Sequence, residues 1–176
     1  MTIKFLKNID NLKHSVEIVE ELLPQLSKTE MFYYFPFETN RSLEVNVQID
    51  LDIDEFNFIN LTEAFLEKWN EYELSILNSF ENFTNINNIE TETEFNCYLT
   101  IYGPYGYYNV PNEIFVNVSK KFPEFQLETL VHEILHLAID NSSSQEKVSE
   151  SKVDDLFIEF FGHIFPKYLK QKELKK

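Results

Sequence analysis

One stretch of the chain reads Glu128-Thr-Leu-Val-His-Glu-Ile-Leu-His-Leu-Ala-Ile-Asp140 and joins an apolar band to two histidines. The apolar residues recur at three and four, which predicts a helix over residues 124–140 that packs one side into a core. His132 and His136 are four residues apart, so they lie on the same side of that helix, one turn from each other.

This H-E-x-x-H pattern predicts a metal site, usually one for zinc, because both imidazoles can reach a single ion. Glu133 can then serve as the general base toward a metal-bound water. The alternative interpretation is a pair of hydrogen-bonded core histidines beside a surface glutamate, since a pattern this short also arises by chance.

Zinc in a catalytic site takes three protein ligands and leaves one position for water, so the pattern needs a third ligand. A third histidine close behind is excluded, because Ile139 and Ser142 stand where that class of enzyme has a glycine and its third histidine. A carboxylate is the other usual choice. The helix predicted over residues 146–170 offers Glu146, Glu150, Asp154, Asp155 and Glu159.

Helical phase separates these five carboxylates. Glu150 and Asp154 share the inward face of the predicted helix with Val153, Phe157 and Phe161. A buried carboxylate costs several kcal/mol unless it is paired or bound to a metal. We therefore expect Glu150 to be the third ligand and Asp154 to accept a hydrogen bond from the distal nitrogen of one histidine. An ordinary charged helix is the alternative for both.

The order His132-Glu133-x-x-His136, a short connection, then Glu150-x-x-x-Asp154 resembles the gluzincin metallopeptidases, the thermolysin-like group. In that family the second helix supplies the third zinc ligand, and an aspartate four residues later orients a histidine. The connection is shorter than in thermolysin, and Ser149 stands where that enzyme has an asparagine. The chain also looks like compact predicted metallopeptidases of bacteria, whose second helix reads Glu-x-x-Val-Asp.

The resemblance implies a zinc-dependent peptidase whose substrate, a peptide or protein, pairs with an antiparallel edge strand. Phe95–Tyr102 and Glu113–Ser119 are the expected strands, because they immediately precede the motif helix. It also implies a group that stabilises the oxyanion. The tyrosines expected near the substrate are Tyr102, Tyr105, Tyr107 and Tyr108. For each of them, simple packing is the alternative.

The rest of the chain predicts an α+β fold in one domain, residues 1–176, and the resemblance implies that this domain is zincin-like. We expect a small, mostly antiparallel sheet with helices on one side. Helices are predicted over residues 10–27 and 61–82, with further strands over Met31–Phe37 and residues 43–53. Loops are predicted over Asn82–Glu94 and residues 103–112, the latter because it holds two of the three glycines.

Composition limits the partners. A net charge of -15 argues against nucleic-acid binding and against anionic membranes. No run approaches the roughly 18–20 apolar residues of a membrane span, and no signal peptide is recognisable. The single cysteine, Cys97, fits a reducing compartment, so we expect a cytoplasmic protein.

The alternative function is a non-enzymatic module that keeps the fold, with or without the metal, and acts as a regulatory or partner-binding protein through its acidic surface. An acidic mimic of DNA is a third interpretation, weakened because the charges are spread over every predicted element.

Overall fold

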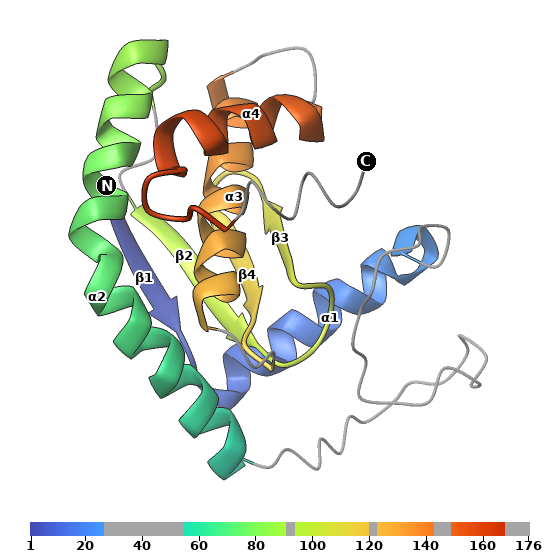
Figure 1. The fold of residues 1–176 in the computed structure, drawn as a ribbon. Helices are drawn as coiled ribbons and strands as arrows, with labels where there is room; N and C mark the ends of the chain where they lie inside the picture. The colour runs from blue at the N-terminus through green and yellow to red at the C-terminus, as the bar shows by residue number, and fades with distance from the viewer. Residues whose placement is uncertain (27–54, 91–93, 120–122, 143–148, 168–176) are drawn as a thin grey trace.

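A computed structural model describes residues 1–26, 55–90, 94–119, 123–142 and 149–167 (Figure 1). The predicted strands over Met31–Phe37 and residues 43–53 lie outside the described residues. In chain order the elements are β1 (Thr2–Leu6), α1 (Ile9–Leu26), α2 (Glu55–Asn87), β2 (Glu94–Thr100), β3 (Gly106–Asn109), β4 (Glu113–Asn117), α3 (Pro123–Ser142) and α4 (Glu150–Phe161).

The four described strands form one mixed sheet in the order β1-β2-β4-β3. The pairs β1–β2 and β2–β4 are parallel, and β3–β4 is antiparallel. The expected α+β class is therefore confirmed, but the expected mostly antiparallel sheet is wrong. Parallel neighbours need a long crossover between them, and the chain from α1 to α2 provides it between β1 and β2.

Strand β3 is the element that sequence patterning missed, because it lies inside residues 103–112, which were predicted to be a loop. Its presence changes which strands lie at the edge. β2 lies between β1 and β4, and β4 lies between β2 and β3. Phe95–Tyr102 and Glu113–Ser119 were expected to include the edge strand that pairs with a substrate, and that prediction is wrong because β2 and β4 are internal strands. Among the described strands, β1 and β3 are the outer ones.

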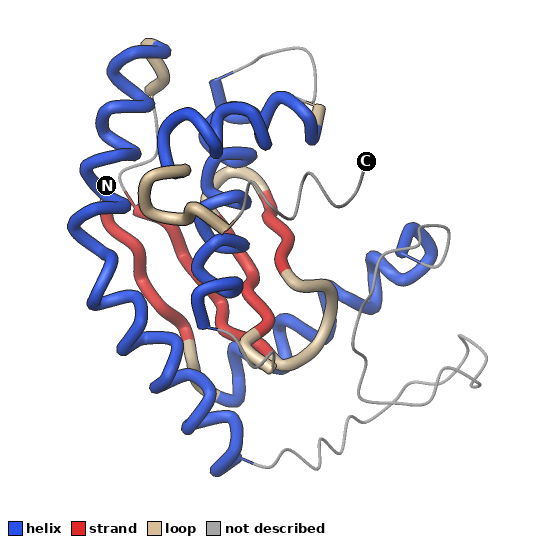
Figure 2. The backbone as a smooth tube through the Cα atoms, in the orientation of Figure 1, coloured by secondary structure: helices blue, strands red, loops and turns tan. Residues whose placement is uncertain are grey.

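Helices cover both faces of the sheet, whereas the sequence predicted helices on one side. Along β2, Phe95, Cys97 and Leu99 belong to the core shared with α2, α3 and α4. Tyr98 points the other way, and its ring centroid lies 5.2 Å from that of His14 in α1. Figure 2 shows α3 crossing one face of the sheet with α4 lying across it.

Helix α2 joins the sheet to α4 through a long apolar stripe. It runs from Glu55 to Asn87, so the predicted loop over Asn82–Glu94 is wrong for residues 82–87. The rings of Phe65 and Trp69 pack against Phe5 of β1 at centroid distances of 5.6 Å and 5.3 Å. Further along, Phe83 packs against Phe160 of α4 at 5.4 Å. None of the described helices combines the length and the apolarity that crossing a membrane requires.

Helices α3 and α4 carry the predicted site residues. α3 agrees with the prediction for residues 124–140, and α1 agrees with that for residues 10–27. α4 is shorter than the helix predicted over residues 146–170, because it ends at Phe161, where the N–H of Gly162 donates to the carbonyl of Ile158. Its buried apolar residues are Val153, Phe157, Phe160 and Phe161.

One charged residue of α3, Glu128, is buried in the core of the protein. Glu128 is 6% exposed, and its Oε2 atom has no hydrogen-bond partner among the described residues. Burial raises the pKa of this carboxyl to about 7; Lys167 opposes the shift and Glu124 adds to it. Folding therefore disfavours the ionised form of the Glu128 carboxyl.

We expect Glu128→Gln to stabilise the protein at high pH and to be neutral at low pH. The pKa of the Glu128 carboxyl is near 4.5 in the unfolded chain and near 7 in the folded chain. The free-energy penalty of burying its charge therefore grows between pH 4.5 and pH 7 and is complete above pH 7. At pH 8 the variant should gain about 1–3 kcal/mol in the free energy of unfolding, measured with urea.

Glu124→Gln is the matched control in the same helix. Glu124 is paired with Lys68 at 3.3 Å, and its pKa is lowered, so this substitution should give no gain at pH 8. Equal stability of the Glu128→Gln variant and the natural protein at pH 8 would contradict the assignment of Glu128 as a buried, unfavourable charge.

Candidate metal centre

The two histidines of α3 point their Nε2 atoms at each other. His136 is 4% exposed and His132 is half-buried, and their Nε2 atoms are 3.2 Å apart. The rings meet edge to face, with centroids separated by 4.9 Å and planes inclined by 64°. This geometry follows from the four-residue spacing, because side chains one turn apart project over the same side of a helix.

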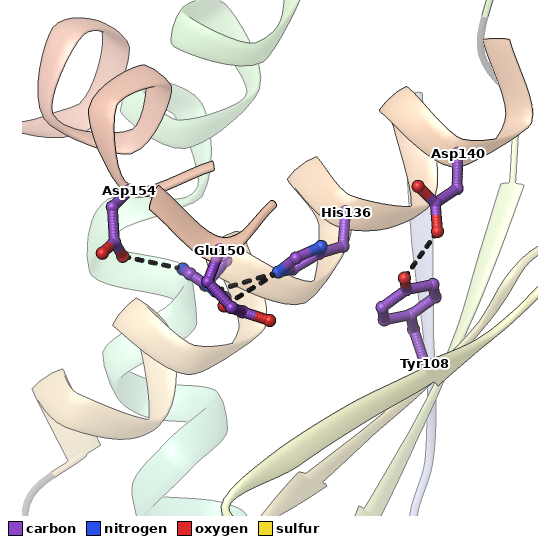
Figure 3. A network of polar contacts seen from close by, with 6 residues as sticks. Tyr108, His136, Asp140, Glu150 and Asp154 are labelled. Atoms are coloured by element: carbon purple, nitrogen blue, oxygen red, sulfur yellow. Dashed lines mark hydrogen bonds and ion pairs between the residues drawn. The ribbon is translucent and has the colours of Figure 1, made fainter. Parts of the chain in front are cut away.

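Glu150 is the first residue of α4, and its carboxylate completes the group. Its Oε2 atom lies 3.2 Å from Nε2 of His132 and 3.3 Å from Nε2 of His136, as Figure 3 shows. The carbonyl of Ser149 accepts hydrogen bonds from the N–H groups of Lys152 and Val153, which fixes the start of the helix and so the position of Glu150. The structure thus brings the three predicted ligands together.

The nearly equilateral triangle of donor atoms fits a tetrahedral cation. Two ligands held at 2.0–2.1 Å at the tetrahedral angle lie about 3.3 Å apart, which matches all three separations. Hydrogen bonds alone fit the triangle poorly. If both Nε2–H groups donate to Glu150, they face each other without an acceptor between them. Among the described residues no fourth His, Cys, Asp or Glu side chain belongs to the group.

Electrostatics favour a cation at the same place. The hydrogen bonds from His132 and then His136 hold the pKa of Glu150 well below its usual range. Burial acts to lower the pKa of His136, but Glu150, Glu133 and Asp140 outweigh it, so the pKa is raised. The raised pKa of His136 reflects the negative charges around its imidazole, which favour the binding of a proton there. A metal ion can replace that proton, because metal binding to histidine releases protons.

Asp154 lies one turn after Glu150 and approaches the far side of His132. Its Oδ1 atom is 4.0 Å from Nδ1 of His132, and its side chain is half-buried (Figure 3). The predicted inward face of α4 thus includes Asp154. The sequence did not show which of the two histidines Asp154 would contact, and in the structure Asp154 lies beside His132.

Glu133 lies on the side of α3 that faces β3. Burial raises the pKa of its carboxyl to about 7; His132 and His136 oppose the shift and Glu150 adds to it. A cation at the triangle would lower this pKa again. A bound cation would thus favour the ionised carboxylate, which is the form that accepts a proton as a general base.

Only one of the four predicted tyrosines lies beside the three candidate ligands His132, His136 and Glu150, which are called the metal group below. The ring of Tyr108 stacks on His136, with centroids 5.3 Å apart and planes inclined by 13°. Tyr107 faces the opposite side of the sheet, where its hydroxyl donates to the carbonyl of Ser15 at 3.3 Å. Tyr105 packs its ring against Phe125 near the start of α3. No contact between Tyr102 and the metal group appears among the described residues.

Sequence reasoning missed Asp140, which accepts a hydrogen bond from the hydroxyl of Tyr108 at its Oδ2 atom, at 2.6 Å. A signal was present, because Asp140 follows His136 by four residues and so shares its side of the helix. Burial is the main cause that raises the pKa of Tyr108, and the bond to Asp140 adds to it, so the phenol stays protonated.

Strand β3 runs beside α3 in the same direction as the helix. The contacts follow in order along both elements: Tyr105 with Phe125, Gly106 with Thr129 and Glu133, Tyr108 with His136 and Asp140, and the carbonyl of Pro111 with the side-chain amide of Asn141. β3 pairs with β4 on one side. Its other edge pairs with no strand among the described residues, so an edge strand borders the metal group.

Comparison of the chain with protein-family models, with curated proteins and with solved structures returned no match. The interpretation of the site therefore rests on the geometry above.

Gly106 allows β3 to approach α3 this closely, and its replacement tests that packing. A Cβ atom at this position would collide with Cγ2 of Thr129 and would lie 3.0 Å from Cγ and Oε1 of Glu133. We expect Gly106→Ala to cost about 1–3 kcal/mol in the free energy of unfolding, measured with urea. Adding Thr129→Ser removes the colliding methyl group and should restore most of that loss.

Thr129→Ser alone is the control, because serine keeps the hydroxyl that donates to the carbonyl of Phe125 at 2.9 Å. A double variant that is no more stable than Gly106→Ala would show that Thr129 is not the residue that limits the approach.

Proposed function

We propose that this protein is a zinc-dependent metallopeptidase of the thermolysin-like kind. The observation that carries the proposal is the triangle formed by Nε2 of His132, Nε2 of His136 and Oε2 of Glu150, with sides of 3.2–3.3 Å. Two histidines and one glutamate are a known ligand set of catalytic zinc. A set of three protein ligands is typical of a catalytic zinc site, whereas a structural site usually has four.

Zinc, when bound, supplies a Lewis acid that polarises the scissile carbonyl and acidifies a water molecule. In this proposal Glu133 takes the proton from that water and passes it to the leaving amine. The side chain of Glu133 lies beside Gly106, and its carboxyl interacts electrostatically with His132, His136 and Glu150.

Strand β3 is the place where we propose that the substrate binds. An extended peptide that runs antiparallel to Gly106–Asn109 would add a strand to the sheet and lie along α3. The scissile bond would then lie between the strand edge and the metal group. The substrate is therefore expected to be an unfolded segment or a flexible peptide, because it must be extended and have free backbone N–H and C=O groups to pair with β3.

Two substitutions separate metal binding from chemistry. His136→Ala removes a ligand and should abolish stoichiometric zinc, measured by mass spectrometry of the purified protein. Glu133→Gln should keep the zinc and lower the hydrolysis of a fluorescence-quenched peptide library by about 10²–10⁴-fold, because only the proton acceptor is lost.

Two glutamates of α4 provide a matched pair. Glu150→Gln should weaken zinc binding, whereas Glu159→Gln should not, because Glu159 is exposed and does not belong to the group. Absence of zinc from natural protein never exposed to chelators would refute the metal centre. Zinc binding without any Glu133-dependent hydrolysis would instead favour the alternative, a metal-containing module that binds a protein partner.

A further inference from the structure

His136 needs an orienting contact beyond its own hydrogen bonds. Within the described residues both of those bonds involve Nε2, the atom that faces the metal group. The rotation of an imidazole about its last torsion is broad, so these bonds do not fix the ring plane. Tyr108 lies nearly parallel to that plane, inclined by 13°, and so restricts the ring.

Tyr108 is itself held in place by Asp140. The hydrogen bond between them is 2.6 Å long, which is the short distance of a hydroxyl donating to a carboxylate. Asp140 and His136 are one turn apart on α3, and Tyr108 reaches both from β3. The three side chains therefore form a closed arrangement, which Figure 3 shows beside the ligand group.

This arrangement is costly for the fold. Oδ1 of Asp140 is buried and has no hydrogen-bond partner among the described residues. A buried, unsatisfied acceptor is unfavourable, whereas an apolar pair would fill the same space without that cost. The polar pair therefore indicates a requirement beyond packing.

We propose that Tyr108, anchored by Asp140, is a positioning residue that holds the imidazole of His136 in its metal-binding orientation. The inference rests on the proposed metal centre and assigns each histidine its own support: Asp154 beside His132, and the Tyr108–Asp140 pair beside His136. It also gives the Tyr108 hydroxyl a role other than substrate binding.

The test measures metal affinity in the full-length protein by competition between zinc and a chromogenic chelator at neutral pH. Tyr108→Leu removes the stack and should weaken the affinity by about 10–100-fold. Tyr108→Phe keeps the ring but loses its anchor and should weaken it by about 3–10-fold. The visible absorption of bound Co²⁺ should change in both variants, because the ligand geometry changes.

Tyr107 supplies the matched controls. Tyr107→Phe and Tyr107→Leu alter the neighbouring tyrosine of the same strand, which faces α1, and should leave metal affinity unchanged. Asp140→Ala should weaken affinity more in the natural protein than in the Tyr108→Phe variant, because the two substitutions remove the same bond. Urea unfolding of each metal-free variant checks that it is folded.

The outcomes distinguish this inference from the proposed function. Failure of the natural protein to bind zinc would overturn both. Stoichiometric zinc with equal affinity in the Tyr108→Phe, Tyr108→Leu and Tyr107→Phe variants would overturn the positioning role and leave the metal centre standing. Unchanged affinity with lost peptide hydrolysis in the Tyr108→Phe variant would also overturn it, and would assign the hydroxyl to the substrate instead.

Discussion

Helix α3 is held between the sheet on one side and α4 on the other, and the proposed site depends on that placement. The helix presents two imidazoles 3.2 Å apart because they are one turn apart. The sheet side brings β3, with Gly106 and Tyr108, against the same helix. The α4 side brings Glu150 and Asp154. Each neighbour of the metal group thus reaches it through packing of α3 and not through a dedicated loop.

Local patterns were enough to predict the helical half of this arrangement. The spacing of His132 and His136 fixes their relation within one helix, whatever surrounds it. For Glu150 and Asp154, helical phase identified the inward face because Val153 and Phe157 share it, and both are buried. Phase could not show that Glu150 is itself exposed. Glu150 is the first residue of α4, and its side chain extends toward the histidines.

The sheet could not be predicted in the same way, because strand order is set by pairings between distant parts of the chain. Residues 2–6 pair with residues 94–98, and no local pattern in either segment shows it. β3 has only four residues and begins with a glycine, and prolines at positions 104 and 111 lie on either side, so the composition of this segment is that of a loop. Missing β3 also hid the difference between Tyr107 and Tyr108. Adjacent strand residues face opposite sides, and only the register with β4 shows which one meets α3.

The division of the ligands between two helices has a mechanical consequence. His132 and His136 belong to one rigid element, whereas Glu150 belongs to another that begins eight residues after the first one ends. An ion shared by both helices would act as a cross-link between them, much as a disulfide would. Its binding free energy then adds to the stability of the α3–α4 pair by mass action. Melting temperature would thereby report metal occupancy.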